Sequence, residues 1–187
     1  MNQAHISCIH SGDTLHSPAI VCVMDQALAM LDRPVKTPCI GVCSTGIGDS
    51  VCRGCKRFSH EVIDWNSYTL EQKRIIDARL SGFLSQCVSN KLQVQDAALL
   101  KWQLEVQQIP FMVHHDEYCW VFTLLKAGAG QINHTSDFGF EVDLRYRDLS
   151  LTALRECIDQ EFLTLSQAHY ERYMLAPDLF REGAGTE

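Results

Sequence analysis

The sequence predicts an α+β protein, with a helix-flanked four-cysteine metal module and a small antiparallel sheet covered by a C-terminal helix. Four closely spaced cysteines, two segments with period-two alternation and one long helical pattern behind them support this prediction. The chain has 187 residues, the length of one domain or two small ones. We expect three parts: a leader and helix in residues 1–33, the cysteine module in residues 34–88, and the sheet with its helix in residues 92–180.

The first part is expected to be a polar leader followed by a helix that ends before Pro34. Ser17 and Pro18 suit the N-cap and the first helical position, and apolar residues recur behind them at helical spacing. The leader lacks the basic and apolar regions of a secretory signal, and the helix is too short to span a bilayer. We therefore expect a cytoplasmic protein with reduced thiols and no membrane partner.

Two short helices are predicted directly after the last cysteine of the module. Ser59 suits the N-cap of the first helix. Thr69 suits the N-cap of the second, because Gln72 completes a capping box three residues later. The expected buried face of the second helix consists of Leu70, Ile75, Ile76, Leu80 and either Phe83 or Leu84.

The sheet is predicted from alternation in residues 100–106 and 140–146, and from two apolar runs between them, residues 111–114 and 118–126. Residues 126–131 are expected to form a turn or loop. Short links between the strands imply antiparallel pairing. The apolar faces are expected to be Leu100, Trp102, Leu104 and Val106 in the first strand and Phe140, Val142, Leu144 and Tyr146 in the last.

A long helix with Ser150 as its N-cap should cover the apolar face of the sheet. Its apolar stripe is Leu151, Leu154, Ile158, Phe162 and Leu165. Two further groups are expected to be buried in the core. They are the tryptophans Trp65 and Trp102, and the cysteines Cys8, Cys22, Cys87, Cys119 and Cys157.

The four remaining cysteines, Cys39, Cys43, Cys52 and Cys55, form two close pairs joined by a short loop. Each short spacing returns the second thiolate towards the first, so four sulfurs can surround one metal ion at about 2.3 Å. We expect Gly54 to adopt a positive φ and to turn backbone N–H groups towards the sulfurs. The spacing therefore predicts a metal site with these four ligands.

Three interpretations of the cluster remain open. A structural Zn²⁺ is the default for four cysteines without an open coordination position. An iron–sulfur cluster uses the same ligands, although its familiar spacings differ. A redox pair is disfavoured, because the strand-then-helix context of a thioredoxin-like motif is absent and the first two cysteines would have no role. The spacing favours zinc without separating it sharply from iron–sulfur.

A longer pattern surrounds the cysteines. It consists of Thr37-Pro-Cys-Ile-Gly-Val-Cys43, Val51-Cys-Arg-Gly-Cys55, Arg57, His60-Glu61, Ile63, Trp65, Glu71-Gln-Lys-Arg74 and Leu80. In this pattern, over about residues 34–84, the chain resembles domain-of-unknown-function family 1289, small bacterial proteins commonly labelled predicted iron–sulfur proteins. The resemblance implies a bacterial protein. It makes an iron–sulfur cluster more favoured than the spacing alone does, but zinc remains the preferred occupant of the site. It implies no reaction, and the chain from about residue 92 resembles no family.

The charge balance bears on possible partners. Lys plus Arg is 16 and Asp plus Glu is 23, so the formal net charge is −7. This balance argues against broad electrostatic binding of nucleic acid or of an anionic membrane. A local basic group, Lys36, Arg53, Lys56 and Arg57, surrounds the cysteines. We interpret it as compensation for the net −2 of a four-thiolate zinc site, with a partner-binding surface as the alternative.

The expected function is that of a non-catalytic zinc adaptor that binds a protein partner, with nucleic acid possible but less favoured. The alternative is an iron–sulfur electron carrier or redox sensor, and a third is an enzyme whose site lies in the second half. The run from His114 to Glu117 is interpreted as a solvated turn between two strands. Adjacent strand residues point to opposite faces, so His114 and His115 are expected to be poor co-ligands.

Overall fold

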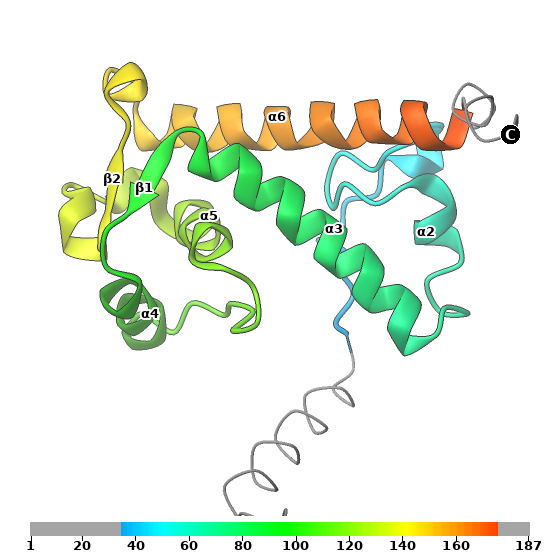
Figure 1. Ribbon diagram of the computed structural model, residues 1–187, viewed down its shortest axis with the longest axis horizontal. Helices are drawn as coiled ribbons and strands as arrows, with labels where there is room; N and C mark the ends of the chain where they lie inside the picture. The colour runs from blue at the N-terminus through cyan, green and yellow to red at the C-terminus, as the bar shows by residue number, and fades with distance from the viewer. Residues whose placement is uncertain (1–34, 176–187) are drawn as a thin grey trace, which may run out of the picture. The chain divides into compact units, whose positions relative to one another are not determined.

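Helices form most of this computed structural model, which describes residues 35–175 (Figure 1). The predicted leader and its helix, with Cys8 and Cys22, lie outside the described residues. The α-helices are Ser59–Ile63 (α2), Leu70–Ser89 (α3), Ala97–Val106 (α4), Glu117–Gly128 (α5) and Leu151–Tyr170 (α6). The strands are Leu92–Val94 (β1) and Phe140–Val142 (β2). Single turns are Thr45–Ile47 (η1), Ala129–Gln131 (η2), Thr135–Phe138 (η3), Leu144–Tyr146 (η4) and Glu171–Leu175 (η5).

The two strands pair antiparallel, with Leu92 opposite Val142 and Val94 opposite Phe140. Leu92 and Phe140 are fully buried, and Val94 and Val142 are partly buried against the same core. The α+β class is confirmed, but the sheet is smaller than predicted: residues 144–146 form η4 rather than strand, and Leu144 is exposed.

A glycine completes the sheet at the start of β2. The backbone N–H groups of Gln95 and Asp96 both donate to the carbonyl oxygen of Gly139, at 2.8 and 2.9 Å. Gly139 has a φ of +75°, and a Cβ at this position would collide with the carbonyl oxygen of Asp96. Only glycine satisfies both conditions without strain.

The predicted strand over residues 100–106 is wrong, because this segment forms α4. Asp96 caps the helix by accepting a hydrogen bond from the N–H of Leu99 at 2.9 Å. Leu100 and Leu104, four residues apart, are buried, whereas Trp102 and Val106 are 55% and 57% exposed. The alternation therefore contained one helical pair that faces the core and one that faces water, and the expected burial of Trp102 is also wrong.

The two apolar runs that follow are not strands either. Residues 118–126 lie in α5, which Asp116 caps by accepting from the N–H of Cys119 at 3.0 Å. This helix buries residues around most of its circumference, so no helical stripe marks it in the sequence. The buried residues are Cys119, Val121, Phe122, Leu124 and Leu125. The expected loop at residues 126–131 is instead the end of α5 followed by η2.

Two of the predicted helix caps, Thr69 and Ser150, are confirmed. Thr69 and Gln72 form the capping box at the start of α3, and Ser150 accepts from the N–H of Ala153 at the start of α6. On α3, Ile76 and Leu80 are buried but Ile75 is exposed. In α2, Ser59 is the first helical residue rather than the cap.

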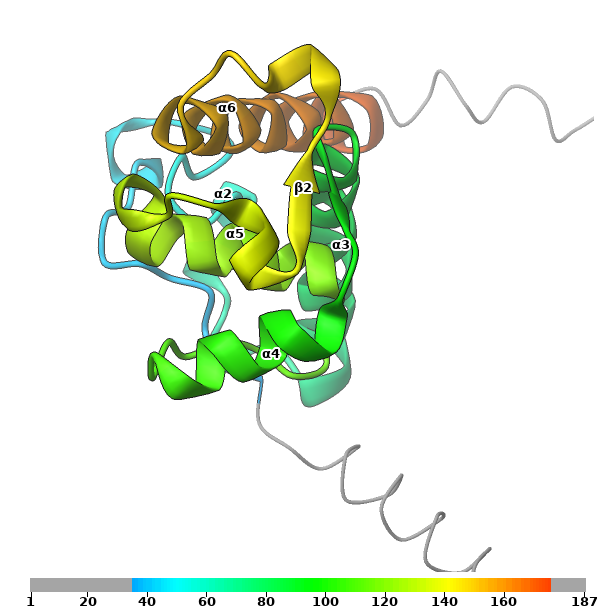
Figure 2. The ribbon, with the colours of Figure 1, turned by 90° about the vertical axis from the view of Figure 1, so that its left-hand side faces the viewer.

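The helices are stacked in the order α6, α5, α4, and α3 runs beside them (Figure 2). The main core lies between them, and α6 packs on α3 and α5 rather than chiefly on the small sheet. The described residues belong to one compact unit. Within residues 35–175, every helix is too short or too polar to cross a membrane.

A second, smaller core fixes the cysteine segment, residues 35–58, to the far end of α6. Val51 and Phe58 pair across an isolated antiparallel bridge and pack on Leu163, with Tyr170 against them. The C-terminal helix therefore contacts both the helical core and the segment that holds the four cysteines.

Candidate metal centre

The second cysteine pair lies in a tight hairpin between Val51 and Phe58. The N–H of Cys52 donates to the carbonyl of Arg57, and the N–H of Lys56 donates to the carbonyl of Cys52, both at 2.8 Å. These bonds close the turn and leave Cys52 1% and Cys55 7% exposed. Both are free thiols, so the hairpin presents two sheltered sulfurs at one end.

Cys52 is placed where its thiolate is stabilised. Burial raises the pKa of this thiol, but backbone hydrogen bonds from Cys55, Ser44 and Gly54, together with the Cys55 thiol, outweigh burial and lower the pKa to about 6. Backbone N–H groups that point at one sulfur are the outer-shell arrangement that supports a metal-bound thiolate. The surroundings of Cys52 therefore fit a metal ligand.

Cys55 differs from Cys52 in the direction of its pKa shift. Burial raises its pKa, and Arg57, whose Nε donates to the sulfur at 3.4 Å, opposes this effect only in part. The Arg57 guanidinium is buried against the ring of Trp65, and its Nη1 has no hydrogen-bond partner among the described residues. A guanidinium that donates to a thiol favours the deprotonated form of that thiol, which is the form that binds a metal.

The first cysteine pair is exposed. Cys39 accepts a hydrogen bond from the N–H of Gly41 at 3.5 Å, and Cys43 contacts the hydroxyl of Thr45 at 3.0 Å. Gly41 has a φ of +88°, the conformation that turns its N–H back to the sulfur. The glycine role that the sequence assigned to Gly54 is therefore found at Gly41.

Gly54 has a different role, because its φ is not positive. A Cβ at Gly54 would lie 2.7 Å from the carbonyl oxygen of Val42 and 3.0 Å from the side chain of Ile40. Glycine is required here because the loop that carries the first pair rests on the loop that carries the second. The hydrogen bond from the N–H of Arg53 to Ser44 Oγ, at 2.8 Å, joins the same two loops.

The structure brings the two loops together but does not assemble the four sulfurs. Within residues 35–175, no three of Cys39, Cys43, Cys52 and Cys55 have sulfurs within 4.8 Å of one another. The four-ligand site therefore stays a prediction. A four-ligand site requires the exposed pair, Cys39 and Cys43, to move onto the buried pair, Cys52 and Cys55. The contact at Gly54 already holds the two loops next to each other.

The basic residues of the segment have separate roles. Arg57 contacts Cys55, as expected for charge compensation. Arg53 is 66% exposed and forms an ion pair with Asp49. Lys56 is buried, and its ammonium group forms an ion pair with Asp159 on α6. Only Arg57 of these three has its charged group bonded to a cysteine sulfur.

A cavity of about 420 Å³ opens beside the cysteine segment, between Ile40 and Gly54 on one side and α5 and α6 on the other. Its walls carry four basic side chains, Arg53, Lys56, Lys126 and Arg155. The sequence does not indicate this cavity, because its walls come from three separate stretches of the chain.

A second cluster, of two histidines and one aspartate, lies outside the cysteine segment. The sequence pattern did not predict it. His114 and His115 do not lie on a strand, so the argument that they face opposite ways fails. They occupy a turn before α5, and the Nε2 atom of each ring contacts Asp77 on α3. No spacing rule connects residues so far apart in sequence.

Residues 37–83 match the model of a family described as "Protein of unknown function (DUF1289)", which confirms the resemblance and its restricted range. The match comprises the four cysteines, α2 and most of α3, and it leaves out α4, α5 and α6. No curated protein and no solved structure matches this chain.

Proposed function

We propose that residues 37–83 form a structural zinc module, with Cys39, Cys43, Cys52 and Cys55 as ligands, and that the protein is a non-catalytic adaptor that binds a protein partner. The observation that carries this proposal is the close contact of the two cysteine loops at Gly54, together with the N–H of Gly41 that donates to the sulfur of Cys39 and the backbone donors that lower the pKa of Cys52. Such donors stabilise thiolates, the form of cysteine that binds a metal.

A structural role follows from the ligand set. Four thiolates fill the tetrahedral positions of Zn²⁺ and leave none for a substrate. The cysteine segment also has a very small core of its own, Val51 and Phe58 against Leu163. A bound ion would supply cohesion that so few apolar contacts do not. We place the protein in a reducing bacterial cytoplasm, where thiols stay available as ligands.

Exposed apolar side chains near the cysteines favour a protein partner. Ile40, Val42 and Ile47 are 54%, 72% and 79% exposed and lie within one short loop. Apolar side chains gathered on a surface mark sites of protein contact, and the cavity beside Ile40 extends this surface. The net charge of −7 disfavours a nucleic-acid partner.

Metal analysis of protein purified without air tests the zinc module. We expect zinc held through extensive dialysis, a colourless sample, and loss of that zinc in Cys52→Ser. Cys157→Ser is the matched control, because Cys157 is a partly exposed thiol outside the segment. A brown protein that contains iron and sulfide would replace zinc by the alternative, an iron–sulfur electron carrier or redox sensor.

The partner surface is tested separately. Val42→Asp combined with Ile47→Asp should remove a co-purifying protein while zinc is retained. Val106→Asp is the control, because Val106 is 57% exposed on α4, away from the cysteine loop. Equal loss with Val106→Asp would mean that the cysteine loop is not the binding surface.

A further inference from the structure

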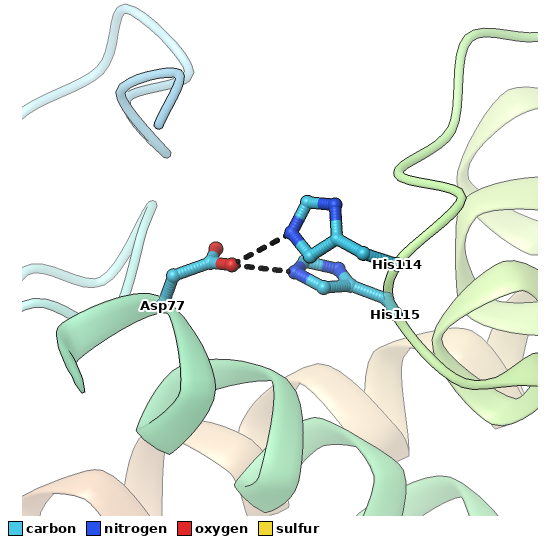
Figure 3. A group of neighbouring side chains, drawn as sticks. All are labelled: Asp77, His114 and His115. Atoms are coloured by element: carbon cyan, nitrogen blue, oxygen red, sulfur yellow. Dashed lines mark hydrogen bonds and ion pairs between the residues drawn. The ribbon is translucent and has the colours of Figure 1, made fainter. Parts of the chain in front are cut away.

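The turn before α5 and the middle of α3 bring two imidazoles and one carboxylate together (Figure 3). The Nε2 atoms of His114 and His115 lie 3.0 and 2.9 Å from the same oxygen, Oδ2 of Asp77. These three atoms all lie within 4.8 Å of one another, and within residues 35–175 no other set of three such groups does. The figure shows both rings extending from the turn towards one carboxylate.

Both sides of the cluster are held in place by their own contacts. The N–H of His115 and the indole Nε1 of Trp120 donate to the carbonyl of Met112, at 3.0 and 2.9 Å. The thiol of Cys119 donates to the carbonyl of Ser81, which ties α5 to α3 just beyond Asp77. The turn is therefore fixed on α3 without any contribution from the two imidazoles.

We propose that His114, His115 and Asp77 bind a divalent transition-metal ion of the zinc class, separate from the cysteine site, through the two Nε2 atoms and Oδ2. This site goes beyond the proposed zinc module and does not rest on it, because its residues come from α3 and from the turn that precedes α5.

The distances suit such an ion. Bonds of about 2.0–2.1 Å in a tetrahedral site place neighbouring ligand atoms about 3.3 Å apart. The contacts of His114 and His115 with Asp77 need to widen by only a few tenths of an ångström to reach that value. The two rings meet edge to face, with centroids 4.5 Å apart, so they approach the carboxylate from different directions.

The donor set selects the class of ion. Two imidazoles and one carboxylate suit zinc, nickel, cobalt or iron, whereas calcium and magnesium prefer oxygen ligands alone. The Nε2 atom of each ring already lies against Oδ2 of Asp77, so an ion would take the place of the proton in each of these contacts. On metal binding each neutral ring would carry its proton on Nδ1, leaving Nε2 free to coordinate.

The site has an open side. His115 and Asp77 are each 19% exposed, but His114 is 62% exposed. Three protein ligands leave at least one coordination position, which water would fill from this side. The ion would therefore exchange with solvent more readily than one enclosed by four thiolates.

Calorimetric titration of Zn²⁺ into the full chain, with its cysteine site already filled, tests the site. We expect one further equivalent to bind, and we expect His114→Ala, His115→Ala and Asp77→Asn each to weaken its binding at least about tenfold. Imidazole ¹⁵N shifts on zinc addition should identify two coordinated rings. His134→Ala is the matched control, because His134 is an exposed loop histidine outside the cluster.

The variants separate this site from a merely structural contact. His114 is mostly exposed, so His114→Ala should keep the parent melting temperature even if His115→Ala does not. Cys52→Ser should lose the cysteine zinc and keep the second equivalent. Parent affinity in His114→Ala, an equal loss in His134→Ala, or no binding beyond the cysteine site would each overturn the assignment.

Discussion

Lys56 and Asp159 form an ion pair between the end of the cysteine hairpin and the middle of α6, with Lys56 Nζ 2.5 Å from Asp159 Oδ1. Lys56 is almost completely buried and has a φ of +60°, a conformation that L side chains rarely adopt. Its ammonium group also donates to the carbonyls of Arg53 and Gly54. A single lysine therefore closes the cysteine turn and ties it to the C-terminal helix.

Lys56→Met should lower the free energy of unfolding by about 1–3 kcal/mol, the range for lost hydrogen bonds to a charged group. A value in the lower part of this range is expected, because Asp159 is 48% exposed and can be solvated. Urea unfolding followed by circular dichroism measures the change. Arg53→Met is the control: the Arg53 side chain is 66% exposed, and a change below about 0.5 kcal/mol is expected. Equal effects of the two variants would contradict the role of Lys56.

In metal-free protein, the Cys52 thiolate should form with a midpoint near pH 6, well below the ordinary value of 9.0. A lowered folded-state pKa stabilises the fold fully above pH 9, and this contribution is lost as the pH falls towards 6. Thiolate absorbance at about 240 nm follows the titration, and Cys52→Ser should remove that step. A first thiolate step near pH 9 would show that the backbone donors do not act on this sulfur.

Gly54→Ala should disturb the contact between the two cysteine loops, because the new Cβ would press on the carbonyl of Val42. We expect a loss of roughly 1–3 kcal/mol, the usual cost of overpacking, with faster release of zinc to a chelator. Gly46→Ala is a matched control, since nothing lies within 4 Å of a Cβ there. If both variants melt alike, the loops do not depend on this close approach.

The basic residues around the cysteines should respond unequally to substitution. Arg57→Gln removes the hydrogen bond to Cys55 and should speed zinc loss to a chelator by about tenfold or more, as for other outer-shell partners. Arg53→Gln should leave metal retention unchanged, because Arg53 is bonded to Asp49 rather than to a sulfur. Loss of a protein partner in Arg53→Gln, with zinc retained, would indicate that this exposed arginine belongs to a contact surface.

Local signals predicted the parts of the fold that local chemistry determines. The capping residues Thr69 and Ser150 marked the starts of the two long helices, because a side-chain oxygen that satisfies free N–H groups acts within a few residues. The alternation over residues 100–106 predicted the wrong element. Residues four apart, which share one face of a helix, also fit a period of two. Leu100 and Leu104 satisfy both patterns, and tertiary packing decided between them.

The two candidate metal sites differ in how visible they are in the sequence. The four cysteines lie close together in the chain, so spacing alone suggested a site. Asp77 and His114 are brought together only because α3 packs on α5. The roles of Gly41 and Gly54 were similarly hidden, since one depends on a backbone torsion and the other on a neighbouring loop.

The pairing of Leu92 with Val142 has a consequence for the order of folding. The two strands are short, and residues 95–139, with α4 and α5, lie between them. Closing so long a loop costs entropy that a three-residue ladder cannot repay. The strands should therefore pair only after the two helices have docked. The sheet would then form late in folding, and it would be the first element to open.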